Sequence, residues 1–256
     1  MPVEHLEYVD RALELVEQAR EHRIELRILG SLAYRIHCPQ NVALFEKMER
    51  DLTDVDLAAR SDQRKEIRAF MRDRGYVIDQ DLVVATEGRR YAFSAPSWSS
   101  MVVDVFFDEL YFCHPIPLRD RLALDYPTIT PTDLLLEKMQ IVEINPKDVK
   151  DAFVLLLEHG LDSESKEGID ARYIAKLLAD DWGFYYTVTR NLEKLRRDVA
   201  DYGALAEPQR KVINARIAQL EQTIEGTPKT TRWKLRARIG PRKKWYQDVA
   251  EKSETF

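Results

Sequence analysis

The sequence predicts an α+β fold, in which a small mixed β-sheet with packed helices is followed by a helical C-terminal region. Strand-like and helix-like segments alternate in the order β-α-β-α-β-β up to residue 107, whereas only helical periodicity follows Tyr126-Pro127. The 256 residues are 45% hydrophobic and 32% charged, which suits a globular chain with a proper core. We expect one domain over 1–128 and a helical domain over 129–256, with residue 160 as an alternative boundary.

Each element of the N-terminal half is expected from its apolar spacing. Apolar residues recur every three or four positions over residues 4–22, which indicates an opening helix. Residues 24–29 alternate apolar with charged side chains, as a half-buried strand does. Gly30-Ser31 breaks this strand and begins a helix that Pro39 ends. The remaining expected segments are a strand over 53–58, a helix over 61–75, and strands over 89–94 and 100–107.

The C-terminal half shows helix starts and helical periodicity. Thr130-Pro131 and Asn145-Pro146 each place a capping side chain before a first-turn proline. Apolar residues step by four, three and four positions over 188–199 and again over 213–224. Because a short polar linker separates the two series, we expect an antiparallel helical hairpin.

The composition excludes several classes of protein. Every apolar run is shorter than ten residues, too short for a membrane span. The start of the chain is polar and acidic, unlike a signal peptide. Two cysteines, Cys38 and Cys113, do not make a disulfide scaffold. We therefore expect a cytoplasmic protein with no membrane partner.

Three aspartates are the most informative residues. Asp54 and Asp56 are two positions apart on an expected strand, so both point to one face, about 6.6 Å apart along the chain. Asp104 lies inside the apolar run 101–107, where an unpaired carboxylate is costly to bury. Such carboxylates indicate a metal site. The alternative interpretation is that Asp54 caps a turn and that Asp104 forms an ion pair with an arginine.

The Gly-Ser turn adds a candidate phosphate site. Gly30 allows close approach of a ligand to the backbone. Ser31 begins a helix whose free N–H groups favour an anion, and its hydroxyl is a further donor. Gly-Ser is also a common plain turn, so its value depends on the aspartates that follow.

The chain resembles the DNA polymerase β-type nucleotidyltransferase superfamily in its Gly-Ser turn, its Asp-x-Asp pair and its third acid on a neighbouring strand. More narrowly, it resembles the AbiEii-type nucleotidyltransferases, a group that includes toxins of toxin–antitoxin systems. The resemblance covers residues 24–158, and lysine replaces arginine in the helical Arg-Asp-x-x-Asp pattern of that group. The matching stretches are 30–35, 50–56, 137–138 and 147–151.

This resemblance implies two-metal phosphoryl transfer from an NTP to a hydroxyl acceptor such as tRNA or protein, and a cognate antitoxin as a partner. Asp54, Asp56 and Asp104 would bind two Mg²⁺ ions about 3.5–4 Å apart. Lys138 and Asp151, on later helices, are the other candidate catalytic residues. The candidate nucleotide-binding residues are Gly30, Ser31, Arg35 and Arg50.

Lys138 and the two arginines also have plain structural interpretations. Lys138 falls within the apolar stripe of its helix, where a lysine must extend to solvent, pair with an acid or enter a cleft. Asp151 lies beside apolar residues without a capping role, which favours a functional one. Arg35 and Arg50 are candidates for phosphate contact, although most arginines are surface residues.

A basic segment, residues 229–244, follows the expected hairpin. Eight lysines and arginines and no acid lie between Gly226 and Tyr246, together with Trp233 and Trp245. Cations interleaved with aromatic rings are typical of RNA binding. The alternative is a solvated helix face anchored by one tryptophan. The candidate nucleic-acid-binding residues are Arg232, Lys234, Arg236, Arg238, Lys243 and Lys244.

Two other functions compete with RNA or protein modification. An antibiotic-type transferase would modify a small molecule, with Tyr91, Trp98 and Tyr111 lining its pocket. A protein that kept the fold and lost turnover would only bind nucleic acid or a partner. No Walker or dinucleotide glycine motif is present in the sequence.

Overall fold

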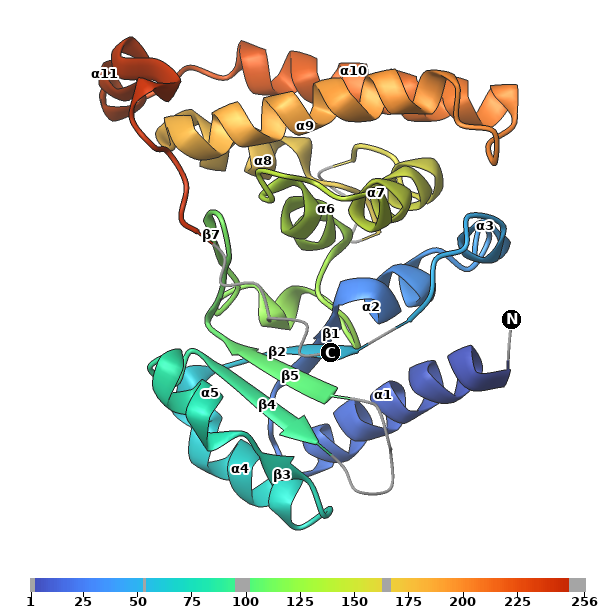
Figure 1. The fold of residues 1–256 in the computed structure, drawn as a ribbon, viewed down its shortest axis with the longest axis vertical. Coiled ribbons are helices and arrows are strands. Elements are labelled where there is room, and N and C mark those ends of the chain that lie inside the picture. The colour runs from blue at the N-terminus through green and yellow to red at the C-terminus, as the bar shows by residue number, and fades with distance from the viewer. Residues whose placement is uncertain (1–2, 53, 95–101, 163–166, 249–256) are drawn as a thin grey trace.

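The computed structural model describes residues 3–52, 54–94, 102–162 and 167–248. It confirms the predicted α+β fold, with a five-stranded mixed sheet and a helical region that follows it (Figure 1). The first elements are α1 (Val3–Glu21), β1 (Leu26–Leu29), α2 (Gly30–His37), α3 (Ala43–Lys47), β2 (Val55–Ala59), the 3₁₀ turn η1 (Ser61–Gln63), α4 (Arg64–Arg72), β3 (Val77–Ile78) and α5 (Gln80–Ala85).

The later elements complete the sheet and then build the helical region. The strands are β4 (Arg90–Ser94), β5 (Val102–Phe107), β6 (Glu109–Tyr111) and β7 (Pro115–Pro117). The helices and 3₁₀ turns are η2 (Leu122–Leu124), α6 (Pro131–Met139), α7 (Pro146–Glu158), α8 (Ala171–Asp180), α9 (Trp182–Ala200), α10 (Glu207–Gly226), α11 (Thr231–Ile239) and η3 (Gly240–Arg242).

The order of strands in the sheet is β1-β2-β5-β4-β3. β2 and β5 run parallel, and the other neighbours are antiparallel. β5 is apolar and buried along most of its length, as a strand in the middle of a sheet must be. The register places Asp56 of β2 opposite Leu29 of β1 on one side and Asp104 of β5 on the other.

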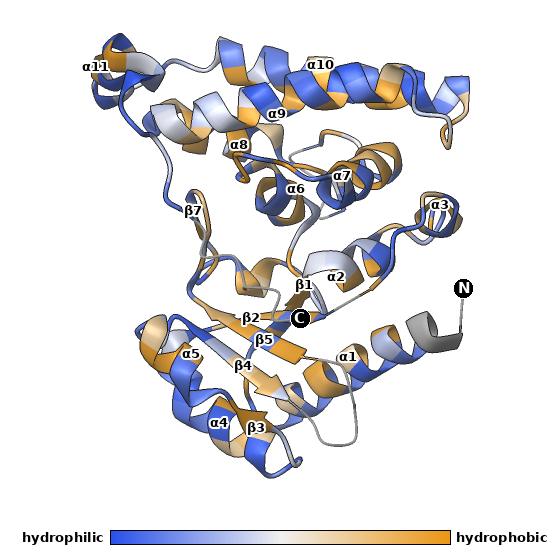
Figure 2. Ribbon diagram, in the orientation of Figure 1, coloured by the Kyte–Doolittle hydropathy of each residue, from blue (hydrophilic) through white to orange (hydrophobic). Residues whose placement is uncertain are grey.

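Helices cover the sheet and then stack away from it. In Figure 1, α1 and α4 lie below the sheet and α2 lies above it, toward the helical region. α2 packs against both α6 and α7, so it connects the sheet to that region. The central strand β5 is hydrophobic, whereas α10 and α11 carry many hydrophilic residues (Figure 2).

The predicted helix starts and hairpin are present. The side chain of Thr130 accepts a hydrogen bond from the N–H of Asp133, and that of Asn145 from the N–H of Asp148. α9 and α10 form the helical hairpin, joined by six residues. The apolar side chains of both predicted series are buried between the helices: Val188, Leu192, Leu195, Val199, Ile213, Ile217, Leu220 and Ile224.

Several short elements leave no signal in the sequence. α3, β3, α5 and the β6–β7 hairpin have two to six residues each, too few for a periodic signal. The helix expected over 61–75 is a 3₁₀ turn followed by α4. Thr53, Trp98 and Met101 lie outside the described residues. Within the described ranges, no helix has the length and apolar character needed to cross a bilayer.

Candidate active site

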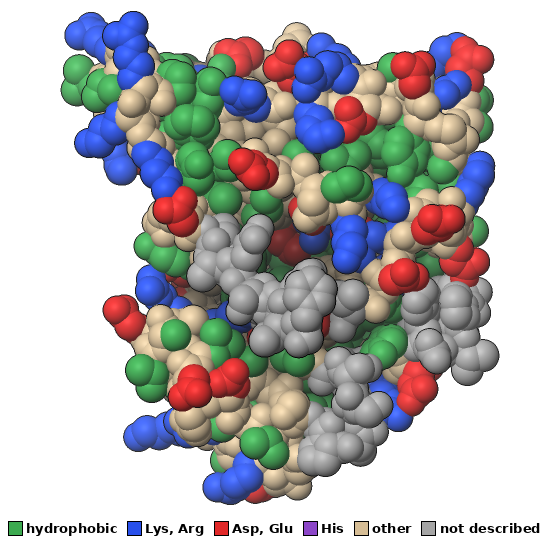
Figure 3. Space-filling view, viewed as in Figure 1, with side chains coloured by type: hydrophobic (Ala, Val, Ile, Leu, Met, Phe, Trp, Pro, Cys, Tyr) green, Lys and Arg blue, Asp and Glu red, His purple; other side chains and the backbone are tan. Residues whose placement is uncertain are grey.

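Asp56 and Asp104 lie side by side at the centre of the sheet. The parallel register of β2 and β5 pairs them directly, and Asp54 lies one residue before β2 begins. Burial, followed by the charges of Asp104 and Glu137, raises the pKa of Asp56 to about 7. The ionised form is therefore costly here unless a cation compensates it. Figure 3 shows a hollow between the sheet and the helical region, with acidic and basic side chains inside it.

Gly30 brings the backbone against Asp56. Its φ of +66° is in the left-handed region, and a Cβ at this position would lie 2.2 Å from Oδ2 of Asp56. Glycine is therefore required here for two separate reasons. The Gly30 N–H donates to Oε2 of Glu137 at 3.1 Å, which connects α2 to α6. Ser31 is buried in the first turn of α2, so the structure brings the Gly-Ser turn and Asp56 together.

Arg90 binds both oxygens of Asp104. Its Nε lies 3.1 Å from Oδ1, and its Nη2 lies 2.7 Å from Oδ2. The side chain of Asp104 is only 2% exposed, so this bidentate pair compensates a buried charge. Of the two interpretations of Asp104, ion pairing with an arginine is the one that the structure displays. Arg90 was not among the predicted residues, because strand register decides this pairing and the sequence does not reveal register.

Lys138 is buried among three carboxylates and does not extend to solvent. Its Nζ lies 3.0 Å from Glu137, 3.3 Å from Asp148 and 3.6 Å from Asp151. Burial alone would lower the pKa of Lys138, but the charges of Glu137 and Asp151 outweigh it and raise the pKa. The ammonium therefore stays charged. Because Glu137 also holds the Gly30 N–H, Lys138 is connected to the Gly-Ser turn through one side chain.

Arg50 and Arg35 use their donors within the protein. Arg50 binds Asp151 through both carboxylate oxygens, each at 2.9 Å, and Asp151 is fully buried. Arg35 donates to the carbonyls of Ser31 and Arg50, and burial lowers its pKa to about 10. Both arginines are 6% exposed. Arg50 therefore contacts the acids around Lys138 through Asp151, and Arg35 contacts Arg50. A contact of either arginine with a phosphate stays a prediction.

Two of the three predicted metal ligands suit a hard cation. Besides burial, the charge of Asp54 is close enough to raise the pKa of Asp56, and carboxylate oxygens are the ligands that Mg²⁺ prefers. Asp104 is held by Arg90 instead. Among the residues that the structure describes, no three His, Cys, Asp or Glu side chains are arranged to hold a metal ion. The chemistry of the donors therefore fits one Mg²⁺ at Asp54 and Asp56, and a second ion stays a prediction.

The basic segment lies apart from these carboxylates. α11 occupies the far corner of the helical region, away from β2 and β5 (Figures 1 and 3). Arg236 is partly buried, whereas the other candidate nucleic-acid-binding residues are exposed: Arg232, Lys234, Arg238, Lys243 and Lys244. Trp233 and Trp245 both pack against α9, through Tyr185 and Tyr186 respectively.

The aromatic pocket expected for a small-molecule acceptor is not formed by Tyr91. Its ring is 5% exposed and packs edge-on against Phe107 and Phe93 in the core. Tyr111 is 41% exposed and lies under the guanidinium of Arg89. Trp98 lies outside the described residues. Tyr91 is therefore a core residue.

Comparison of this chain with protein-family models, with curated proteins and with solved structures finds no match. The geometry of the site and the sequence motifs are therefore the basis of the functional assignment.

Proposed function

We propose that this chain is a metal-dependent nucleotidyltransferase of the DNA polymerase β type, which transfers NMP from an NTP to a hydroxyl acceptor. The observation that carries the proposal is the pairing of Asp56 with Asp104, with the backbone of Gly30 in close contact with Asp56. The Gly-Ser turn and the Asp-x-Asp pair support the same assignment through the sequence resemblance.

The residues of the site have distinct roles in this proposal. The first turn of α2, with Ser31, binds the triphosphate, because the N–H groups that follow Gly30 and the helix dipole favour an anion there. Mg²⁺ at Asp54 and Asp56, when bound, neutralises charge on the reacting phosphates. Asp104 takes the proton of the acceptor hydroxyl, whose oxygen bonds to the α-phosphorus as the bond to the pyrophosphate leaving group breaks.

Arg90 and Lys138 are positioning residues in this scheme. Arg90 orients Asp104 by holding both of its oxygens. Lys138 holds Glu137, which in turn binds the N–H of Gly30. Asp151 fixes Lys138 and Arg50 from α7. This set keeps the Gly-Ser turn and the carboxylates at a constant separation, as in-line transfer requires.

RNA is the acceptor class that the basic segment favours, because it combines exposed cations with two partly exposed tryptophans, Trp233 and Trp245. A protein acceptor and a cognate antitoxin rest on the AbiEii resemblance alone. An antibiotic-type acceptor loses support, because Tyr91 is in the core.

A second candidate is a binding protein without turnover. The observation in its favour is that Arg90 already compensates the charge of Asp104. Such a protein would bind RNA through the basic segment and leave the NTP unchanged.

The deciding experiment incubates the full chain with each α-³²P-labelled NTP, Mg²⁺ and total RNA, and resolves RNA and protein on a denaturing gel. We expect label on RNA from at least one NTP. Asp56→Asn, which keeps the shape of the side chain, is expected to abolish labelling, whereas Asp73→Asn on the exposed end of α4 is expected to leave it unchanged. Absence of transfer to any RNA or protein, with RNA still bound, would establish the binding protein instead.

A further inference from the structure

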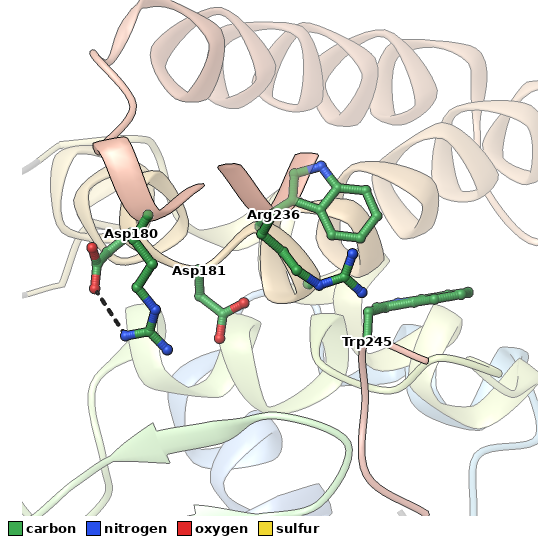
Figure 4. A pocket seen from close by; sticks show the side chains of 7 residues that line it. Asp180, Asp181, Arg236 and Trp245 are labelled. Atoms are coloured by element: carbon green, nitrogen blue, oxygen red, sulfur yellow. Dashed lines mark ion pairs between the residues drawn. The ribbon is translucent and has the colours of Figure 1, made fainter. Parts of the chain in front are cut away.

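A cavity of about 270 Å³ opens beside the N-terminus of α9, away from the candidate active site. α8, α9, α11 and the segment after η3 contribute its walls. Figure 4 shows Asp181, Arg236 and Trp245 bordering this cavity, with the Asp180–Arg232 ion pair at one end. This volume is at the lower limit for ligand pockets, so the cavity accommodates one small ring system.

Two flat groups in the wall of the cavity are held in place by the protein. The guanidinium of Arg236 lies 4.6 Å above the ring of Trp182 and donates to the carbonyls of Gly240 and Lys243, each at 2.7 Å. The indole N–H of Trp245 donates to Oγ1 of Thr187 at 3.1 Å. Because these hydrogen bonds already fix both side chains, a planar ligand that stacks on them immobilises little further side-chain motion. This lowers the entropic cost of binding.

Gly183 keeps the Trp245 side of the cavity close to α9. A Cβ at this position would lie 2.5 Å from the carbonyl oxygen of Trp245. Gly183 is the second residue of α9, and its φ is not unusual, so the close approach of the chain is the reason for glycine here.

Asp181 supplies acceptors at the same cavity. Its Oδ1 caps α9 by accepting the N–H of Phe184 at 3.0 Å. A carboxylate has about four lone-pair positions, so one capping bond leaves capacity for a ligand donor. Arg232 lines the cavity and is 79% exposed. Further exposed cations follow on the same segment, namely Lys234, Arg238, Lys243 and Lys244, the last of them in an ion pair with Asp248.

We infer that this cavity and the basic segment bind single-stranded RNA, with one guanine in the cavity. The base stacks on Arg236 and Trp245, and its N1–H and N2–H groups donate to Asp181. Guanine is chosen because its Watson–Crick edge alone presents two adjacent donors to one carboxylate. The exposed cations bind the phosphates on either side. This inference deepens the proposed function by naming a feature of the RNA acceptor, and RNA binding itself is measured without catalysis.

Fluorescence anisotropy of the full chain with labelled nonamers U₄GU₄, U₄AU₄ and U₄CU₄ tests the inference. We expect U₄GU₄ to bind at least about fivefold more tightly than the other two, the lower end of what one base contributes. Trp245→Ala is expected to weaken U₄GU₄ binding at least about fivefold. Asp181→Asn, which preserves helix capping, is expected to remove the preference for guanine while U₄AU₄ affinity is unchanged.

Control variants separate the cavity from general electrostatics. Arg238→Gln is expected to weaken all three oligomers equally and to reduce the salt slope by about one. Lys211→Gln, at the far end of α10, is expected to change nothing. The inference would be overturned by any of three results. These are equal affinity for the three oligomers, a preference for guanine that survives Asp181→Asn, and equally tight binding of duplex RNA.

The exposed apolar side chains of α11 suggest the alternative to RNA binding, which is a protein partner. Leu235 and Ile239 are 56% and 47% exposed and one helical turn apart, as in a protein-binding face. If no oligomer binds, the inference is wrong and a protein partner on this face is favoured. Asp56→Asn is expected to bind RNA as the unmodified chain does, so loss of transfer with intact RNA binding counts against the proposed function alone.

Discussion

Arg90 and Asp104 form a bidentate ion pair across β4 and β5, with Nη2 and Oδ2 2.7 Å apart. The arginine is 22% exposed and the aspartate is 2% exposed, so the pair connects the buried centre of the sheet to its surface. The third carboxylate of the candidate site is thus oriented by a residue of the neighbouring strand.

Arg90→Gln is expected to destabilise the protein by about 3 kcal/mol, because it leaves the carboxylate of Asp104 buried without its cation. Urea unfolding measures this loss. Arg72→Gln, at an arginine 75% exposed, is the control and is expected to stay within about 0.5 kcal/mol. Adding Asp104→Asn to Arg90→Gln is expected to recover most of the loss. A double variant as unstable as the single one would show that packing of Arg90, rather than charge, matters.

Gly30→Ala is expected to abolish nucleotidyl transfer, because the new methyl group displaces the carboxylate of Asp56. Gly75→Ala is a matched control. Gly75 also has a positive φ, of +80°, but nothing lies within 4 Å of its Cβ position. Both variants should lose about 1 kcal/mol from backbone strain, and only Gly30→Ala should lose transfer. Equal activity of the two variants would rule out the close approach as a requirement.

Lys138→Met is expected to lower the free energy of unfolding by about 3–5 kcal/mol, since Glu137, Asp148 and Asp151 would lose their shared cation. Lys176→Met, on the exposed side of α8, is the control and should be nearly neutral. Chemical unfolding of both variants provides the comparison. A small effect at Lys138 would mean that Arg50 compensates the cluster by itself.

His114 is expected to make the protein acid-sensitive. Burial lowers its pKa to about 4, and its Nε2 lies 2.8 Å from Oγ1 of Thr187. The unfolded state, with a pKa near 6.5, takes up the proton first, so stability is lost as the pH falls from 6.5 toward 4. The loss between pH 7.5 and pH 5 is about 2 kcal/mol.

His114→Gln isolates this contribution, because glutamine does not titrate. Unfolding midpoints of both proteins at the two pH values test the prediction. The unmodified chain should lose about 2 kcal/mol more than the variant between pH 7.5 and pH 5. Identical pH dependence in the two proteins would show that other groups control acid sensitivity.

Much of the fold was predictable from local patterns. Strand alternation, the Pro-containing helix starts and the 4-3-4 apolar steps identify elements because they reflect which side chains must face a core. Short elements such as β3 and α3 were missed, because two to five residues contain too few repeats of a strand or helix period to be recognised.

The sequence by itself determined the α+β class, most of the long elements except α8, and the three aspartates, because periodicity and buried charge are properties of single segments. The resemblance implied that Asp104 lies on a strand next to that of Asp56. The tertiary structure alone decided that the two are directly opposite each other, that Arg90 holds Asp104 and that Lys138 joins three acids. These relationships depend on strand register and on helix packing, as does the hydrogen bond between Gly30 and Glu137, which are 107 positions apart. Contacts at such separations arise from the global arrangement of the chain, which local patterns do not specify.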